Sequence, residues 1–133
     1  YAKAQSDEQH RMTLEAIAQH IRDQDLVVTT ALIPGKAAPL LITEEMVRSM
    51  KTGSVIVDLA AEAGGNCALT QAEETITVQG VTIIGATNLP ATVPLHASQM
   101  FSRNVETLIK HLAKDGAVTI DPADEIVGPM IVA

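Results

Sequence analysis

Hydrophobic and polar residues form two different patterns along this chain. Apolar residues recur at helical spacing between positions 6 and 25, and Ser6 with Gln9 forms the pattern of a capping box at the start of that segment. Compact apolar runs are typical of buried strands, and they lie at 26–30, 54–59 and 81–85. The pattern predicts helices and strands that alternate along the chain.

Capping signals indicate two more helices. Thr43 precedes two glutamates, whose carboxylates suit the positive end of a helix, and an apolar stripe follows them. Ser98 is expected to cap a longer helix that stops at Gly116. A short strand is also expected at 75–78.

The order of these elements is an α/β pattern, and short apolar strands are typical of a parallel sheet that is covered on both faces. In such sheets ligands bind at the carboxyl ends of the strands. The chain contains no Gly-x-Gly-x-x-Gly, so the phosphate-binding turn of a dinucleotide fold is not in these residues. If the fold is of that kind, its glycine-rich first half is absent from this chain.

Charge and composition exclude several partners. Sixteen acidic residues against nine basic ones give a net charge of −7, which repels nucleic acid and anionic membrane surfaces. No apolar run approaches the roughly 18 residues of a membrane span, so we expect no direct membrane insertion. The single Cys67 fits a reducing compartment and is interpreted as a small buried residue.

The loops after the expected strands carry the candidate chemistry. Ala31 is small enough for a flat ring to approach while Leu32 packs on that ring, although the same segment is also typical of an ordinary turn. Glu62 could act in acid–base chemistry or accept a hydrogen bond, and Gly65 permits close approach of a ligand. A solvated glutamate beside a flexible turn is the simpler interpretation of that second loop.

The third loop holds Asn88 and Leu89, where the Asn amide could bind a carboxamide or simply form a turn. Asp58, inside a strand, could orient a loop as a hydrogen-bond acceptor. The four histidines lack the spacing of metal ligands, so no metal is expected. The acidic stretch 121–125 is expected to be solvated.

Several segments together resemble the alpha subunit of the proton-translocating nicotinamide nucleotide transhydrogenases, a family that shares its fold with alanine dehydrogenase. The resemblance is collinear from Tyr1 to about Leu112. It is carried by Tyr1-Ala2-Lys3, Thr29-Thr30-Ala31-Leu32-Ile33-Pro34-Gly35-Lys36, Ser54-Val55-Ile56-Val57-Asp58-Leu59-Ala60, Gly64-Gly65-Asn66-Cys67 and Gly80-Val81-Thr82-Ile83-Ile84-Gly85.

The resemblance implies a Rossmann-type, doubly wound parallel sheet. Residues 1–116 would be the later part of an NAD(H)-binding domain, and 117–133 a C-terminal tail or linker. The NAD(H) site would form between the absent first half and this chain. The residues that the resemblance places at the cofactor are Tyr1, Ala2, Ala31, Leu32, Glu62, Gly65, Asn88 and Leu89.

The implied reaction is hydride transfer between NADH on this chain and NADP⁺ on a partner component, coupled to proton movement through a membrane-spanning component. Glu62 would orient other groups, and no residue would act as a catalytic acid or base. The resemblance also implies a homodimer at the cytoplasmic face of the inner membrane or on the mitochondrial matrix side.

Two other functions stay open. The first is an NAD-dependent dehydrogenase of the alanine dehydrogenase type, in which Glu62 takes part in the chemistry. The second is a non-catalytic nucleotide-binding module. Asn66 after the double glycine follows the transhydrogenase pattern, since alanine dehydrogenases usually carry Cys at that position.

Overall fold

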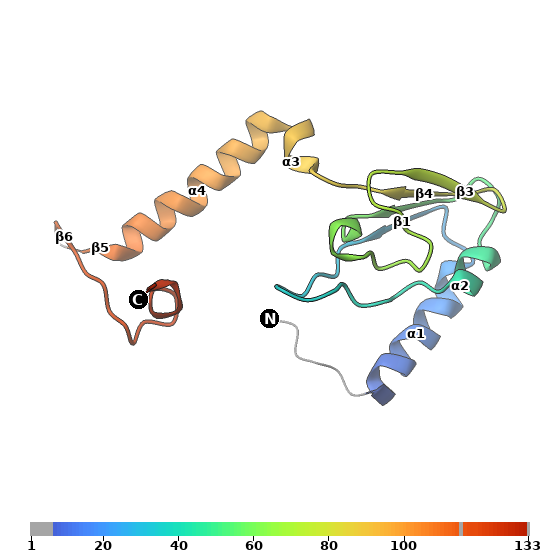
Figure 1. Cartoon of the computed structure of the whole chain (residues 1–133), viewed down its shortest axis with the longest axis horizontal. Helices are drawn as coiled ribbons and strands as arrows, with labels where there is room; N and C mark the ends of the chain where they lie inside the picture. The colour runs from blue at the N-terminus through green and yellow to red at the C-terminus, as the bar shows by residue number, and fades with distance from the viewer. Residues whose placement is uncertain (1–6, 115, 133) are drawn as a thin grey trace. The chain divides into compact units, whose positions relative to one another are not determined.

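The computed structural model describes residues 7–114 and 116–132, which fall into two compact units (Figure 1). The first unit ends at Asn88 and the second begins at Leu89. The domain boundary expected after residue 116 stays a prediction.

The first unit alternates helices and strands, as the sequence pattern predicts. Its elements are α1 (Asp7–Ile21), β1 (Leu26–Thr29), α2 (Glu44–Ser49), β2 (Val55–Asp58), the 3-10 helix η1 (Ala61–Ala63), β3 (Thr75–Val78) and β4 (Val81–Gly85). The strands agree with the predicted ranges to within a residue at each end. The first helix is shorter than predicted, because the chain turns directly after Ile21.

These four strands form one sheet in the order β1-β2-β4-β3. β1, β2 and β4 are parallel, which confirms the predicted α/β fold, but β3 runs antiparallel to β4. The reason is the two-residue connection between them. Gln79 and Gly80 both have positive φ, 50° and 82°, as in the tight turns that join antiparallel strands.

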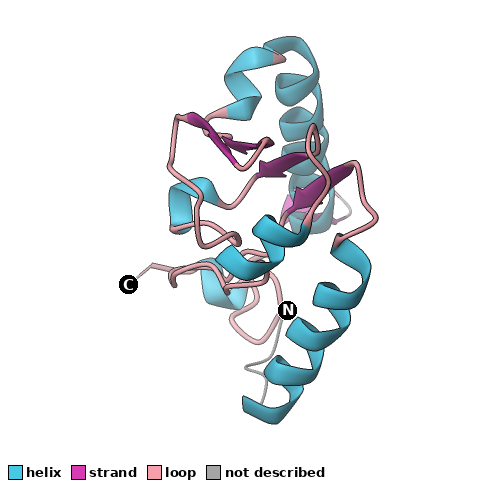
Figure 2. Ribbon diagram, turned by 90° about the vertical axis from the view of Figure 1, so that its right-hand side faces the viewer, coloured by secondary structure: helices cyan, strands magenta, loops and turns pink. Residues whose placement is uncertain are grey.

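The hydrophobic core lies on one face of the sheet. Ile56, Val81 and Ile83 are almost fully buried there, together with Ile42 and Val47. The two helices α1 and α2 lie side by side over this face (Figure 2). Alternate residues of β2 and β4 on the other face are only half-buried. The expectation of a sheet covered on both faces is therefore not met within the described residues of the first unit.

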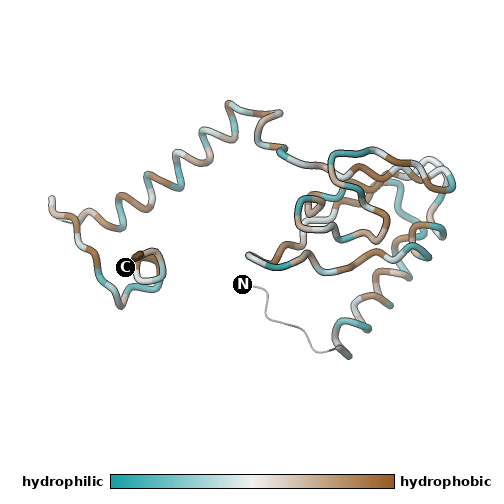
Figure 3. Tube along the Cα trace, viewed as in Figure 1, coloured by the Kyte–Doolittle hydropathy of each residue, from teal (hydrophilic) through white to brown (hydrophobic). Residues whose placement is uncertain are grey.

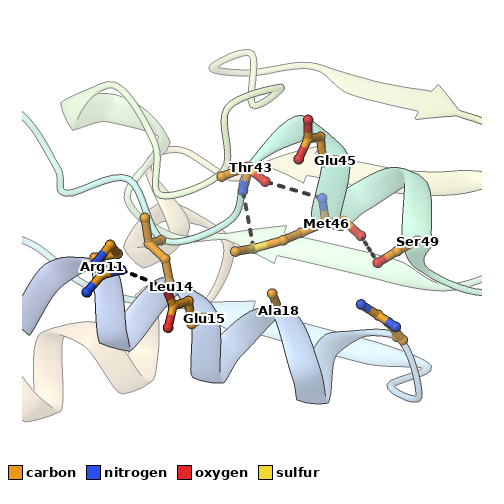
Figure 4. A pocket seen from close by; sticks show the side chains of 9 residues that line it. Arg11, Leu14, Glu15, Ala18, Thr43, Glu45, Met46 and Ser49 are labelled. Carbon is orange, nitrogen blue, oxygen red and sulfur yellow. Dashed lines mark hydrogen bonds and ion pairs between the residues drawn. The ribbon is translucent and has the colours of Figure 1, made fainter.

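The start of α2 confirms Thr43 as the predicted cap. The Thr43 hydroxyl accepts a hydrogen bond of 3.3 Å from the Met46 backbone N–H, and the Met46 sulfur accepts one of 3.5 Å from the Thr43 N–H (Figure 4). Two of the four free N–H groups at the helix start are thereby satisfied. The cap fixes the point at which the loop after β1 rejoins regular structure.

The second unit consists mainly of one long helix. Its elements are α3 (Leu89–Thr92), α4 (Pro94–Leu112), β5 (Ala113–Lys114), β6 (Ala117–Val118) and the 3-10 helix η2 (Gly128–Met130). The prediction that Ser98 caps the long helix is wrong. The helix begins at Pro94, since proline suits the first helical position, and it ends before Gly116.

Few side chains are buried in this second unit. Val127 is the only buried residue among its described positions, and none of the described residues of α4 is buried. Hydrophobic and hydrophilic residues alternate along α4, as Figure 3 shows. The helix is thus amphipathic without a packed core of its own.

Candidate functional site

The carboxyl ends of three parallel strands meet at one edge of the sheet. Thr29, Asp58 and Gly85 are the last residues of β1, β2 and β4, and they are register partners in the two ladders. The loops that leave this edge carry Ala31, Leu32, Glu62 and Asn88. The structure therefore brings the predicted loops to the edge where parallel sheets bind ligands.

A buried carboxylate organises this edge. Asp58 is 0% exposed, and its side chain contacts the last residue of β1 and the loop that follows β2. Its two oxygens accept five hydrogen bonds of 2.7–3.1 Å, from the hydroxyls of Thr29 and Thr70 and from the backbone N–H groups of Ala60, Asn66 and Cys67. The structure supports the interpretation of Asp58 as a hydrogen-bond acceptor that orients a loop.

The surrounding donors keep Asp58 ionised. Burial alone would raise its pKa, but the hydrogen bonds from Thr70, Cys67, Ala60 and Thr29 outweigh burial, and the pKa of Asp58 lies below its ordinary value. An ionised acceptor forms stronger hydrogen bonds than a neutral one. The loop 60–70 is therefore held to the end of β2 by a charge.

Asn66 connects this loop to the one after β1. Its side-chain oxygen accepts a hydrogen bond of 2.9 Å from the Ala31 N–H, and its amide nitrogen donates to the carbonyls of Ala31 and Pro39 at 2.9 and 2.8 Å. Asn66 is 0% exposed. The carboxamide thus pairs both backbone groups of Ala31 as a neighbouring strand would.

Ala31 and Leu32 lie just beyond the carboxyl end of β1. Ala31 is half-buried, whereas 53% of Leu32 is exposed. Leu32 is therefore not a core residue, and its side chain is available to a ligand. Its contact with a nucleotide stays a prediction.

Glu62 reaches across to the loop after β4. Its Oε1 atom accepts a hydrogen bond of 2.7 Å from the Asn88 backbone N–H, and Asn88 has a positive φ of 47°. The carboxylate thus holds a loop backbone in an uncommon conformation. This geometry agrees with an orienting role for Glu62.

Other predicted site residues have different surroundings. Gly65 is buried with φ +85°, and a Cβ atom there would lie 2.9 Å from Asp58 Oδ2 and 2.8 Å from Thr70 Cβ, so internal packing alone explains the glycine. Leu89 begins the second unit and is 39% exposed. Tyr1 and Ala2 lie outside the described residues. The cofactor contacts of these residues stay predictions.

Cys67 is buried, as its sequence context predicts. Burial raises the pKa of its thiol, so the sulfur stays protonated and is a poor nucleophile. Within the described residues, no group of three His, Cys, Asp or Glu side chains could hold a metal ion. None of the helices in the same part of the chain is both long and apolar enough to cross a membrane.

One expectation for the acidic stretch 121–125 is wrong. Asp124 is not simply solvated, because its Oδ1 atom accepts hydrogen bonds from the N–H groups of Ile126 and Val127, both at 2.9 Å. Its Oδ2 atom lies 2.8 Å from Nε2 of His111. These bonds lower the pKa of Asp124 to about 2, and they order the turn that precedes η2.

A surface hollow of about 290 Å³ lies between α1 and α2 (Figure 4). Its lining combines charged and apolar side chains, and none of the predicted site residues belongs to it. The residues around it are Arg11, Leu14, Glu15, Ala18, Arg22, Thr43, Glu45, Met46 and Ser49. The carboxyl edge of the sheet remains the candidate site.

Comparison with known proteins decides the family. The model of the alanine dehydrogenase/PNT C-terminal domain matches residues 2–133. The chain belongs to this family. Within this alanine dehydrogenase/PNT family, it is 48% identical over 129 residues to the NAD(P) transhydrogenase subunit alpha of Haemophilus influenzae, covering 95% of the chain and 25% of that protein.

Solved structures of this alanine dehydrogenase/PNT family share the fold. The transhydrogenase of Sinorhizobium meliloti matches 80% of the chain with 42% identity and a TM-score of 0.67, and an L-alanine dehydrogenase matches 77% with 33% identity and a TM-score of 0.65. The predicted Rossmann-type fold is confirmed. The chain spans about a quarter to a third of the length of these relatives.

The role of Asn66 in this alanine dehydrogenase/PNT domain was missed by sequence reasoning, which used the residue only as a mark of the transhydrogenase pattern. Its partners Ala31 and Pro39 precede it by 35 and 27 positions, so no local motif records the contact. A polar residue directly after two glycines, in the loop that follows β2, was the only available signal.

Proposed function

We propose that this chain is part of the NAD(H)-binding component of a nicotinamide nucleotide transhydrogenase. In this reaction hydride passes directly between NADH on this component and NADP⁺ on a separate component. Direct transfer depends on the alignment of two rings and the exclusion of water, more than on an acid or a base. The residues of this chain would therefore bind and orient the nucleotide.

The position of Leu32 is the observation that supports the proposal most directly. Leu32 is exposed at the carboxyl end of a parallel strand, and the backbone beside it is fixed by Asn66. An exposed apolar side chain on a segment whose backbone is held by hydrogen bonds fits the face of a flat ring. The phosphates would bind to a glycine-rich turn that is not among the residues of this chain.

Two observations favour a transhydrogenase over an alanine dehydrogenase. The chain is more similar in sequence to the transhydrogenases than to the alanine dehydrogenase. In addition, the Glu62 carboxylate accepts a hydrogen bond from the Asn88 backbone, which suits an orienting group. The alanine dehydrogenase reaction remains the second candidate function, with the fold as its support.

The finer parts of the proposal rest on the resemblance to the transhydrogenase alpha subunits. Hydride transfer would be coupled to proton translocation through a membrane-spanning component, with NADP(H) held by a partner component. The NAD(H) component would form a homodimer at the cytoplasmic face of the inner membrane or on the mitochondrial matrix side.

Calorimetric titration of the full-length polypeptide tests the cofactor assignment. NADH should bind more tightly than NADPH, since the acidic charge of the chain disfavours an additional phosphate. Tighter binding of NADPH would overturn the assignment.

A Glu62→Gln variant separates the two enzymes. In the transhydrogenase, combined with its NADP(H)-binding component, most hydride transfer should remain because no proton moves at that step. Glu74→Gln, at another exposed glutamate, is the matched control. A loss of about a hundredfold or more for Glu62→Gln alone, the scale of a general acid–base contribution, would favour the dehydrogenase.

A further inference from the structure

The segment after β1 leaves the sheet immediately. Regular pairing of β1 with β2 ends at Thr29, whose carbonyl accepts a hydrogen bond from the Leu59 N–H at 2.9 Å. Residues 30–40 then contain no helix or strand. Burying a backbone N–H or C=O group that has no hydrogen-bond partner costs free energy. Another group must therefore form hydrogen bonds with Ala31.

The Asn66 carboxamide supplies these missing partners. It accepts from the Ala31 N–H and donates to the Ala31 carbonyl, and its second N–H donates to the Pro39 carbonyl. A single side chain thus fixes both the start and the end of the segment 31–39. Leu32 lies on this segment and is exposed.

Asn66 is itself held in place by its backbone. Its N–H donates to Asp58 Oδ2 at 2.7 Å, and its carbonyl accepts hydrogen bonds from Leu41 and Ile42 at 2.8 and 2.9 Å. The carboxamide is therefore anchored to the end of β2 and to the chain that leads into α2. A fully buried group of this kind cannot reach a ligand at the surface.

We propose that Asn66 is a positioning residue for NADH, which fixes the segment 31–39 in its binding conformation before the nucleotide arrives. Asn66 would set NADH affinity through Leu32 without touching the nucleotide. Binding to a segment that is already ordered avoids the cost of ordering it, which is the general advantage of a preorganised site. The inference rests on the proposed function.

A double-mutant cycle in the full-length polypeptide tests this proposal. Asn66→Ser and Leu32→Ala should each raise the Kd for NADH about tenfold, the effect of losing one apolar contact. The double variant should also lie about tenfold above wild type, because both changes remove the same contact. An additive loss of about a hundredfold would overturn the proposal, since Asn66 would then act independently of Leu32.

Ser54→Ala is the matched control for stability. Ser54 is buried at the opposite end of β2, where its hydroxyl donates to the Gln24 carbonyl at 3.1 Å. This variant should lower the melting temperature without changing the Kd for NADH. An Asn66→Ser variant that is folded and binds NADH as wild type does would contradict the proposal. Failure of the wild-type protein to bind NADH would instead contradict the proposed function.

Amide hydrogen exchange of the wild-type protein keeps the proposal testable if Asn66→Ser does not fold. The Ala31 N–H should exchange slowly in the absence of nucleotide, because Asn66 already binds it, and NADH should slow it little further. Fast exchange of Ala31 that becomes slow only with NADH would show that the ligand orders the segment, and would overturn the proposal.

Discussion

The two units of this chain are stabilised in different ways. The first unit buries aliphatic residues of β2, β4 and α2 in one cluster, whereas the second unit buries Val127 alone among its described residues. Along α4, Phe101, Val105 and Ile109 recur every four residues, and 69%, 38% and 57% of their surfaces are exposed. Both units contain apolar residues at regular spacing.

The difference lies in what faces those residues. The sheet of the first unit offers α1 and α2 an apolar surface, so that hydrophobic burial stabilises all three. The elements of the second unit are joined by local contacts, such as the His111–Asp124 pair and the hydrogen bonds of the turn beside it. Amphipathic spacing therefore predicts a helix without revealing whether a partner for it is present.

The difference between the two units can be tested by shortening one apolar side chain in each and comparing the loss in the free energy of unfolding. In the 133-residue chain, Ile83→Ala should lower the free energy of unfolding by about 2–5 kcal/mol, because it leaves a cavity in the core. Phe101→Ala should change it by no more than about 0.5 kcal/mol, as is usual for exposed residues. Urea unfolding followed by circular dichroism measures both. A similar cost at the two positions would mean that α4 has a packed partner within the chain.

Asp58→Asn tests whether polar contacts also stabilise the first unit. In this variant an NH₂ group replaces one of the two carboxylate oxygens. In place of Oδ2 it would face the donors of Asn66, Cys67 and Thr70, and in place of Oδ1 those of Thr29 and Ala60. Either way, a donor group would face other donors. We expect a loss of about 3 kcal/mol in the free energy of unfolding at pH 7, the scale for a buried group with mismatched hydrogen bonds.

The pH dependence of the same variant sharpens the test. The pKa of Asp58 is lowered in the folded protein, so its contribution is present above the unfolded value of about 3.9 and is lost as the pH falls through the folded pKa. Wild type should lose more stability than Asp58→Asn between about pH 5 and the folded pKa. Parallel pH profiles for the two proteins would show that the charge of Asp58 contributes nothing.

The smallest expected effect belongs to the second unit. Asp124→Ala should disorder the turn at Ile126 and Val127 but leave the amide signals of the first unit unchanged, since its bonds are local. Glu125→Ala, at an exposed neighbour, is the control.

In wild type the Asp124 carboxyl should titrate with a pKa of about 2, and the turn should be lost as the pH falls through that value. Nuclear magnetic resonance detects both changes, and an ordinary Asp pKa would exclude the contacts described.

Local signals predicted much of the fold. The strands at 75–78 and 81–85 agree with their predicted ranges, and Thr43 caps α2 as expected, because each depends on neighbouring residues alone. Ser98 failed as a cap since Pro94 begins the helix one turn earlier. The antiparallel direction of β3 was missed although its signal is local, because only Gln79 and Gly80 separate the two predicted strands and a parallel pair needs a much longer connection.

The candidate site was predicted only in outline. The sequence indicated the three loops at the carboxyl edge, since strand ends can be located from local pattern. The contacts that hold those loops join residues far apart in the chain, as in the bonds of Asn66 to Ala31 and of Glu62 to Asn88. Such pairs arise from tertiary packing and leave no periodic signal.

The turn at Gln79 and Gly80 also bears on the order in which the sheet assembles. It joins β3 to β4 with a two-residue loop, so this pair closes a very short stretch of chain, and hairpins of this kind form within about 1–10 µs. The parallel pairs β1–β2 and β2–β4 must instead bring together strands separated by whole helices and loops, which is slower. Because β4 belongs to both kinds of pair, we expect the hairpin to form first and to present the edge on which β2 docks, with β1 added afterwards on the other side of β2.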